Sequence, residues 1–302
     1  MNERTQPDPE KTEPIAADGY PIASTRYATD GAPRGRVVIA GATGVGQGFY
    51  RHFAAFAQAY GLEAITLDYR GVGKSAPETL KGFDMNFLDW ARLDLAAIVN
   101  AVPEDELPLY LVGHSYGGHA LGLLPNHRRV TASALCATGS GWHGWMPWPD
   151  RLRLVFFWNV IGPVLTRLKG YLPFKMLRMG EDLPLPVYRQ WRRWCHNPDY
   201  FFDDPELADE LTGFARVRCP IVAINATDDG WAPPRSRDVF MRHYENAPVQ
   251  AVDLEPADID LESIGHIDYF RPRARPLWQP MLDWLEQPDA PFRIGQGPPL
   301  QK

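Results

Sequence analysis

Runs of apolar residues alternate with amphipathic stretches along most of this chain, and the alternation predicts its secondary structure. Largely apolar runs at 36–40 and 63–68 are typical of strands that are buried on both faces. Stretches with apolar residues at helical spacing follow them at about 49–60 and 84–99. Strands and helices that alternate at this spacing predict a parallel sheet with crossover helices on both faces.

The pattern continues toward the C-terminus. We expect further strands in the apolar runs at 109–112, 130–136, 220–225 and 250–254. A final helix is expected at about 276–285, where apolar residues again have helical spacing. Weak alternation at 20–27 suggests an early edge strand. The predicted fold class is therefore α/β, with a mostly parallel, twisted sheet.

The alternation of strands and helices stops between residues 139 and 214. Six of the ten tryptophans lie in this segment. An interruption of this kind inside a regular α/β pattern indicates an inserted, aromatic-rich helical cap at 139–214, with the core divided between 19–138 and 215–286. The longest apolar run, 154–165, lies in the cap. It is too short to span a bilayer and suits a buried or interfacial helix.

Both ends of the chain are polar. Residues 1–18 carry acidic side chains where a signal peptide would need an apolar run, and we expect a disordered leader. Residues 287–302 are polar and proline-rich, which predicts a tail.

The composition argues against several classes of protein. A chain of 302 residues is long enough for one large α/β domain with an insertion. The formal net charge of −6 argues against nucleic acid or an anionic membrane as the main partner, so membrane contact remains a lesser alternative. Cys136, Cys195 and Cys219 are too dispersed for a disulfide framework or a cysteine metal site. We expect no cofactor and no metal, a cytoplasmic setting, and a small-molecule substrate; the oligomeric state is left open.

The residues around Ser115 predict a nucleophile. The sequence from 113 to 117 is Gly-His-Ser-Tyr-Gly, between an apolar strand and a short apolar helix. A strand that turns directly into a helix crowds the corner residue, so the positions two before and two after it must lack a Cβ. The alternative is a glycine-rich turn with an incidental serine. The strand before and the helix after favour a nucleophile whose hydroxyl is presented at the tip of the turn.

Such a serine needs an imidazole base that a carboxylate holds in one tautomer. In hydrolases with this strand-turn-helix arrangement, the acid and then the histidine follow the serine. The strand at 220–225 leads into a loop with Asp228 and Asp229, and either can be the acid, although an Asp-Gly pair is also common in plain turns. His243 and His266 follow this loop. His243 lies in a polar helical stretch, whereas His266 lies in a loop after the last strand, which favours His266 as the base.

Two backbone N–H groups are expected to stabilise a developing oxyanion. Tyr116, next to the nucleophile, supplies one. Ala42 or Thr43, in the glycine-rich loop after the strand at 36–40, supplies the other. The same loop has an alternative interpretation as a phosphate cradle, but it lacks the Gly-Lys-Ser/Thr ending of a P-loop and the Gly-x-Gly-x-x-Gly spacing.

Tryptophans near the predicted site suggest its substrate. Trp142, Trp145 and Trp231 are expected to line the pocket, because aromatic walls exclude water and favour an apolar acyl or alcohol group. The alternative is that the cap tryptophans only pack the cap on the sheet.

With these motifs the chain resembles the α/β-hydrolase superfamily from about residue 20 to 286. The matching stretches are the loop at 41–44, Asp68-x-Arg70-Gly71-x-Gly73-x-Ser75, the Gly-x-Ser-x-Gly at 113–117, the loop with a proline four residues after Asp229, and Gly265-His266. The resemblance implies the α/β-hydrolase fold. It also implies Asp229 as the acid, because the superfamily usually places this residue four positions before such a proline.

More narrowly, the chain looks like a bacterial group of serine α/β hydrolases of unassigned substrate. It departs from the commonest superfamily pattern at Ala40-Gly41, where a His-Gly pair often stands, so the second N–H donor stays open. A serine at 115 argues against the dehalogenase and epoxide-hydrolase branches, which carry aspartate there. The predicted function is cleavage of an ester-type acyl bond through Ser115, Asp229 and His266. The alternatives are a thioesterase, an amidase or peptidase, an acyltransferase, or a noncatalytic ligand-binding member of the fold.

Overall fold

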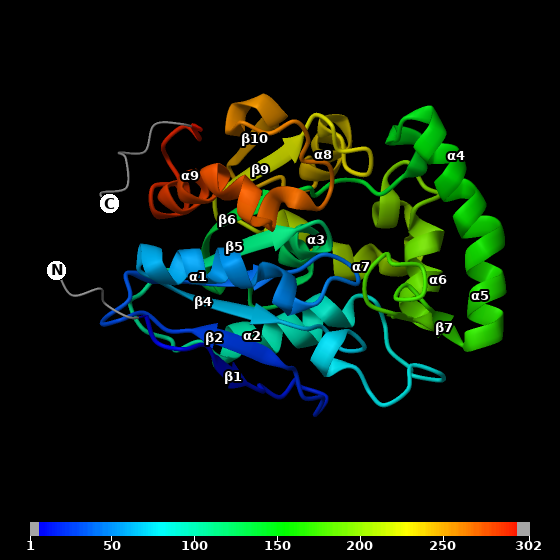
Figure 1. Ribbon diagram of the computed structural model, residues 1–302, viewed down its shortest axis with the longest axis horizontal. Coiled ribbons are helices and arrows are strands. Elements are labelled where there is room, and N and C mark those ends of the chain that lie inside the picture. The colour runs from blue at the N-terminus through cyan, green and yellow to red at the C-terminus, as the bar shows by residue number, and fades with distance from the viewer. Residues whose placement is uncertain (1–5, 295–302) are drawn as a thin grey trace.

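The computed structural model describes residues 6–294 and contains a central eight-stranded sheet in the order β1-β2-β4-β3-β5-β6-β9-β10 (Figure 1). The strands are β1 (Glu10–Thr12), β2 (Ser24–Tyr27), β3 (Gly35–Ala40), β4 (Leu62–Leu67), β5 (Leu109–His114), β6 (Val130–Cys136), β9 (Ile221–Ala226) and β10 (Val249–Leu254). Every pair from β4 to β10 is parallel, whereas β1 and β2 pair antiparallel with their neighbours. The predicted mostly parallel α/β sheet is confirmed.

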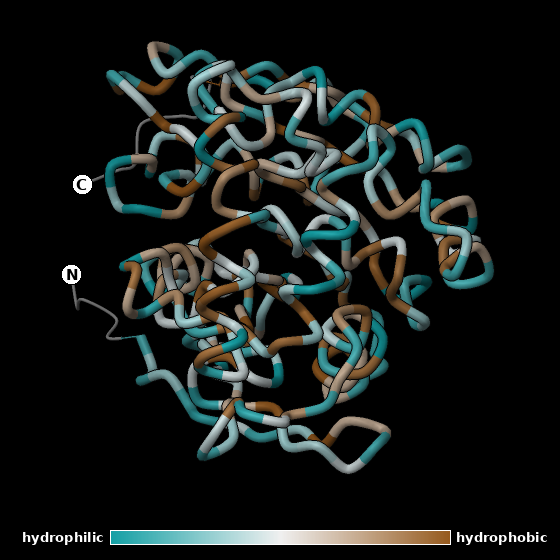
Figure 2. The backbone as a smooth tube through the Cα atoms, turned by 90° about the vertical axis from the view of Figure 1, so that its right-hand side faces the viewer, coloured by the Kyte–Doolittle hydropathy of each residue, from teal (hydrophilic) through white to brown (hydrophobic). Residues whose placement is uncertain are grey.

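Helices cover both faces of the sheet. Those of the core are α1 (Arg51–Tyr60), α2 (Ala96–Ala101), α3 (Tyr116–Leu123), α8 (Pro234–Met241) and α9 (Arg275–Glu286). One buried cluster joins α1 and α9 to one face, and a second joins α2, α3 and α8 to the other. Because both faces are covered, every residue of β3, β5 and β9 is buried, which explains their continuous apolar runs. Figure 2 shows hydrophobic segments running through the interior and hydrophilic segments around the outside.

The N-terminal segment differs from the expected disordered leader. Residues 10–12 form the edge strand β1, so β2 is an inner strand rather than the edge. Asp18 forms an ion pair with the buried Arg70, and Ala16 is only 3% exposed. The sequence pattern does not predict this ordered segment, because backbone hydrogen bonds and two ion pairs, Asp18–Arg70 and Glu10–Arg26, hold it in place. Residues 1–5 of the expected leader lie outside the described residues.

Part of the expected C-terminal tail also contacts the core. The N–H of Phe292 donates to the side-chain oxygen of Gln250 at 2.9 Å, and Phe292 packs against the buried cluster under α9. Residues 295–302 lie outside the described part of the chain.

The segment predicted to form a cap lies beyond the carboxyl ends of the parallel strands (Figure 1). It contains α4 (Trp148–Phe156), α5 (Gly162–Lys169), α6 (Leu185–Trp194), α7 (Ala208–Leu211) and the short antiparallel pair β7 (Tyr171–Leu172) and β8 (Leu183–Pro184). A π-helical segment, Phe157–Ile161, joins α4 to α5. Trp158 and Trp194 are fully buried within the cap. Over residues 6–294, no helix is long and apolar enough to cross a bilayer.

Candidate active site

Ser115 lies at the corner where β5 turns into α3. Its backbone has φ 53° and ψ −111°, a strained conformation for a residue with a side chain. The glycines on either side permit the turn. A Cβ on Gly117 would lie 1.9 Å from the carbonyl oxygen of Ala40, and one on Gly113 would lie 2.7 Å from the backbone of Gly117. The sequence therefore folds at this point only because both positions lack a side chain.

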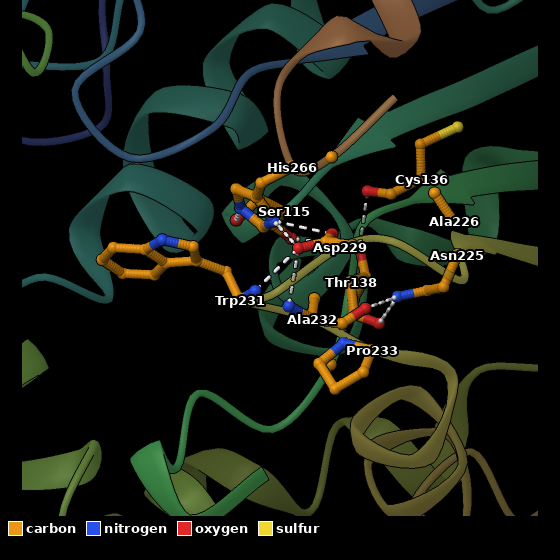
Figure 3. A network of polar contacts seen from close by, with 12 residues as sticks. Ser115, Cys136, Thr138, Asn225, Ala226, Asp229, Trp231, Ala232, Pro233 and His266 are labelled. Carbon is orange, nitrogen blue, oxygen red and sulfur yellow. Dashed lines mark hydrogen bonds and ion pairs between the residues drawn. The ribbon is translucent and has the colours of Figure 1, made fainter. Parts of the chain in front are cut away.

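Ser115, His266 and Asp229 form one chain of hydrogen bonds (Figure 3). His266 Nε2 lies 3.0 Å from Ser115 Oγ, and His266 Nδ1 lies 2.9 Å from Asp229 Oδ2. An ionised carboxylate only accepts hydrogen bonds, so Nδ1–H donates to Asp229 and Nε2 accepts from the serine hydroxyl. This arrangement can move a proton from the hydroxyl to the imidazole.

Asp229 is buried, and several hydrogen-bond donors contact its carboxylate. Its side chain also accepts hydrogen bonds from the N–H groups of Trp231 at 2.8 Å and Ala232 at 2.9 Å (Figure 3). Burial on its own would raise the pKa of Asp229, but the facing imidazole and these hydrogen bonds outweigh burial and lower the pKa. Asp229 is therefore ionised at neutral pH.

The neighbouring Asp228 has a different position. Its carboxylate accepts the backbone N–H groups of Ile264 at 2.9 Å and Gly265 at 3.0 Å. It therefore holds the loop that carries His266 and does not contact the imidazole. The sequence indicates both aspartates as candidates, whereas the structure shows that only Asp229 contacts the imidazole.

The loop after β3 contains the two residues considered for the second N–H donor. The Ala42 N–H donates to the hydroxyl of Tyr50 at 2.8 Å, so this group is already paired. Thr43 N–H has no hydrogen-bond partner among residues 6–294. Tyr116 occupies the first position of α3, where a backbone N–H has no partner within the helix. Thr43 and Tyr116 both line the cavity beside Ser115.

His114, next to the serine, links this loop to the histidine loop. Its Nε2 lies 2.8 Å from the carbonyl oxygen of His266, which can only accept, so Nε2 carries the hydrogen. Burial lowers the pKa of His114 to about 3, so the ring is neutral. Its Nδ1 then accepts from the Tyr50 hydroxyl at 2.9 Å. This network could not be predicted from the sequence, in which only the position of His114 beside Ser115 gives a signal.

A cavity of about 340 Å³ opens beside Ser115. Aromatic side chains from the cap and from the loop after β9 form much of its wall: Phe174, Trp191, Tyr200 and Trp231. The expectation for Trp142 and Trp145 was wrong, because neither lines this cavity. Their ring centroids lie 5.1 Å apart in an edge-to-face arrangement, and the guanidinium of Arg235 lies over the ring of Trp145. Periodicity cannot show which face of an irregular segment turns toward the site.

Two further polar residues line the cavity. His119 lies one helical turn after Ser115 on α3, a spacing that could have indicated its position. Its Nε2–H donates to the Gly139 carbonyl at 2.9 Å, and burial lowers its pKa to about 4, so it is neutral. Arg178, from the loop after β7, is exposed and carries a positive charge at the cavity. Within the described residues, no group of three or more His, Cys, Asp or Glu side chains could hold a metal ion.

Comparison with known proteins identifies the family. The model of the alpha/beta hydrolase family matches residues 37–291. The chain belongs to this family. The predicted α/β-hydrolase fold is therefore confirmed. No curated protein matches this alpha/beta hydrolase.

Several solved structures share the fold of this alpha/beta hydrolase at low sequence identity. DcsB, solved in complex with its substrate analogue, has a TM-score of 0.64 and 16% identity, covering 93% of this chain and 99% of that chain. An N-acyl homoserine lactone degrading enzyme has a TM-score of 0.57 and 18% identity, covering 90% and 100%. A thermophilic esterase from Thermogutta terrifontis has a TM-score of 0.57 and 16% identity, covering 92% and 98%.

Proposed function

We propose that this alpha/beta hydrolase is a serine hydrolase that cleaves an ester-type acyl bond through Ser115, His266 and Asp229. The hydrogen-bond chain from Ser115 Oγ through the imidazole to the buried carboxylate, at the wall of a cavity, carries the proposal. In this geometry the imidazole accepts the proton of the attacking hydroxyl while the carboxylate stabilises the imidazolium that forms.

The reaction proceeds through an acyl-enzyme intermediate. Ser115 Oγ attacks the acyl carbon while His266 Nε2 takes the hydroxyl proton. The N–H groups of Tyr116 and Thr43 donate to the oxyanion of the tetrahedral intermediate. The imidazolium then protonates the leaving alkoxide. Water, deprotonated by the same imidazole, attacks the acyl-enzyme, and the acid is released as the proton returns to Ser115.

Two observations support an ester with an apolar part. The aromatic wall of the cavity suits an apolar acyl or alcohol group. Two of the solved structures that share the fold are described as an esterase and as an N-acyl homoserine lactone degrading enzyme. Thioesters, amides and acyl transfer use the same arrangement and remain the alternatives. The three free cysteines support a reducing, cytoplasmic setting.

Replacement of Ser115 tests the proposal. The wild type is first measured with a panel of p-nitrophenyl esters, thioesters and aminoacyl anilides. It should hydrolyse the esters. Ser115→Ala should abolish this hydrolysis and the labelling by a fluorophosphonate probe, whereas the matched change Ser263→Ala, at an exposed serine, should leave both unchanged. Fluorophosphonate labelling that survives in Ser115→Ala would overturn the proposal.

A further inference from the structure

One face of the long cap helix is apolar and exposed. The helix runs unbroken from residue 148 to 169 as α4, the π-helical segment and α5. Six of its apolar side chains recur at every fourth position and are between 45% and 76% exposed: Trp148, Leu152, Phe156, Val160, Val164 and Leu168. These six residues, here named the outer stripe, are the majority of the large apolar side chains exposed in the described part of the chain.

The helix geometry limits how far the outer stripe winds around the helix axis. A repeat of four residues overshoots an α-helical turn of 3.6 residues by about 40° at each step, so in a pure α-helix the stripe would wind around the axis. The π-helical segment Phe157–Ile161 has i→i+5 hydrogen bonds and more residues per turn, which offsets part of this drift.

The opposite side of the same helix is already occupied. Leu154, Trp158, Gly162 and Thr166, also four residues apart, are buried against the rest of the cap. Helices α4 and α5 run along the outer edge of the molecule (Figure 1). A surface helix with one buried face ordinarily has a polar opposite face. This helix instead has a second apolar face, and the described residues do not cover it.

Basic side chains flank the outer stripe near both of its ends. All four are exposed and each adjoins a residue of the stripe: Arg151 and Arg153 around Leu152, and Arg167 and Lys169 around Leu168. Positions one residue before and after lie about 100° to either side around a helix, so cations border both flanks. Asp150 is the only acidic residue in this helix, and it pairs with Arg153 at 3.3 Å. The helix is therefore locally cationic in a chain whose formal net charge is −6.

We infer that the outer stripe docks on a lipid bilayer that contains anionic lipids, with the helix in the plane of the interface. Tryptophan, phenylalanine and leucine on one face with arginine and lysine on its borders are the features of an interfacial helix. Anionic headgroups complement the four flanking cations. A second copy of this chain is the weaker occupant, because two stripes packed face to face would bring flanking cations of both copies together in either orientation.

Vesicle flotation of the full-length protein tests the apolar contribution. The wild type should float with vesicles of phosphatidylcholine and phosphatidylglycerol, and less with phosphatidylcholine alone. The double variant Leu152→Ser/Phe156→Ser should bind the anionic vesicles at least about tenfold more weakly, since two apolar side chains no longer enter the interface. Ile15→Ser, at an apolar residue that is 60% exposed outside the cap, should bind like the wild type.

Charge reversal tests the cationic borders. Arg151→Glu/Arg167→Glu should lose most binding to the anionic vesicles, and added salt should weaken binding of the wild type. Arg128→Glu/Arg218→Glu, two exposed arginines outside this helix, should have a much smaller effect. Circular dichroism and thermal unfolding of each variant establish that it is folded.

Three outcomes would overturn the inference. The first is no flotation of the wild type with either vesicle. The second is equal flotation of the wild type and Leu152→Ser/Phe156→Ser. The third is a wild-type dimer in sedimentation equilibrium that the same double variant dissolves, without vesicle binding, which would assign the outer stripe to a second copy of the chain. All of these readouts measure binding, so they are independent of the proposed hydrolysis.

Discussion

At the scale of single residues, neighbours of one chemical type make different contacts. Asp229 contacts the imidazole of His266, whereas Asp228 holds the backbone of the same loop. His114 and His119 are buried and neutral, whereas His266 bridges the serine and the carboxylate. The identity of each hydrogen-bond partner therefore separates the candidate acid and base from positioning residues of the same type.

Replacing each carboxylate separately by an amide distinguishes the roles of Asp228 and Asp229. Asp229→Asn should lower kcat by about ten-thousandfold, because the amide no longer holds the imidazole in the required tautomer. Asp228→Asn should cost far less, on the order of tenfold, since the amide oxygen still accepts one of the two N–H groups of the histidine loop. The measurement is the steady-state hydrolysis of a p-nitrophenyl ester. A larger loss in Asp228→Asn would show that Asp228, and not Asp229, is the acid.

Buried His114 makes stability depend on pH. Burial lowers its pKa from 6.5 to about 3, so between these values the unfolded chain binds a proton that the folded chain excludes. The free energy of unfolding should therefore fall as the pH drops below 6.5, by up to an amount on the order of 5 kcal/mol at pH 3. His119 acts in the same direction.

Urea unfolding at pH 7, 5 and 4 measures this dependence. His114→Gln cannot be protonated, so its free energy of unfolding should decline less steeply from pH 7 to pH 4 than that of the wild type. An identical slope in both proteins would show that His114 is not buried in its neutral form.

At the scale of elements, the turn between β5 and α3 depends on close backbone contact. The carbonyl oxygen of Ala40 leaves no space for a side chain at Gly117. A backbone atom cannot move aside as the end of a flexible side chain does. The native turn therefore requires close packing of the Gly117 backbone against β3. The position of Ser115 therefore depends on the packing of α3 against the central strands.

Gly117→Ala should destabilise the protein by more than about 3 kcal/mol and abolish activity, because the new methyl group meets backbone. Gly48→Ala is the matched control, since a Cβ there would have nothing within 4 Å. Thermal unfolding and yield of soluble protein measure the difference. Equal stability of the two variants would contradict the close contact at Gly117.

At the scale of the whole molecule, the N-terminal segment is fastened to the sheet. Arg70 is 4% exposed and pairs with the fully buried Asp94 and with Asp18. Strand β1 adds an antiparallel edge to the sheet. Residues 10–18 are therefore an ordered part of the domain, although most of their side chains are exposed.

The two ion pairs of Arg70 should differ in their contribution to stability. Asp94→Ala removes a buried partner and should cost about 3 kcal/mol or more. Asp18→Ala removes a partner whose side chain is 41% exposed, and should cost less than about 1 kcal/mol. Urea unfolding at neutral pH compares them; a greater loss in Asp18→Ala would contradict this assignment.

The sequence predicts those features that depend on local pattern or chain order. Continuous apolar runs indicate the inner strands, and glycine spacing together with chain order selects Ser115 and His266. Asp229 needed the family resemblance in addition. The cap tryptophans could not be assigned, because the direction in which Trp142 or Trp191 points depends on packing between distant segments. The edge strand β1 was missed because a short polar strand held by backbone hydrogen bonds has no apolar pattern.

Mass spectrometry of the trapped acyl-enzyme tests whether Ser115 is the nucleophile. The wild type is mixed with a p-nitrophenyl ester, quenched with acid during the initial burst, digested and mapped. One acyl group is expected on the peptide that contains Ser115, and none in Ser115→Ala. Ester hydrolysis that proceeds with the acyl group on another residue, or unchanged in Ser115→Ala, would contradict this expectation.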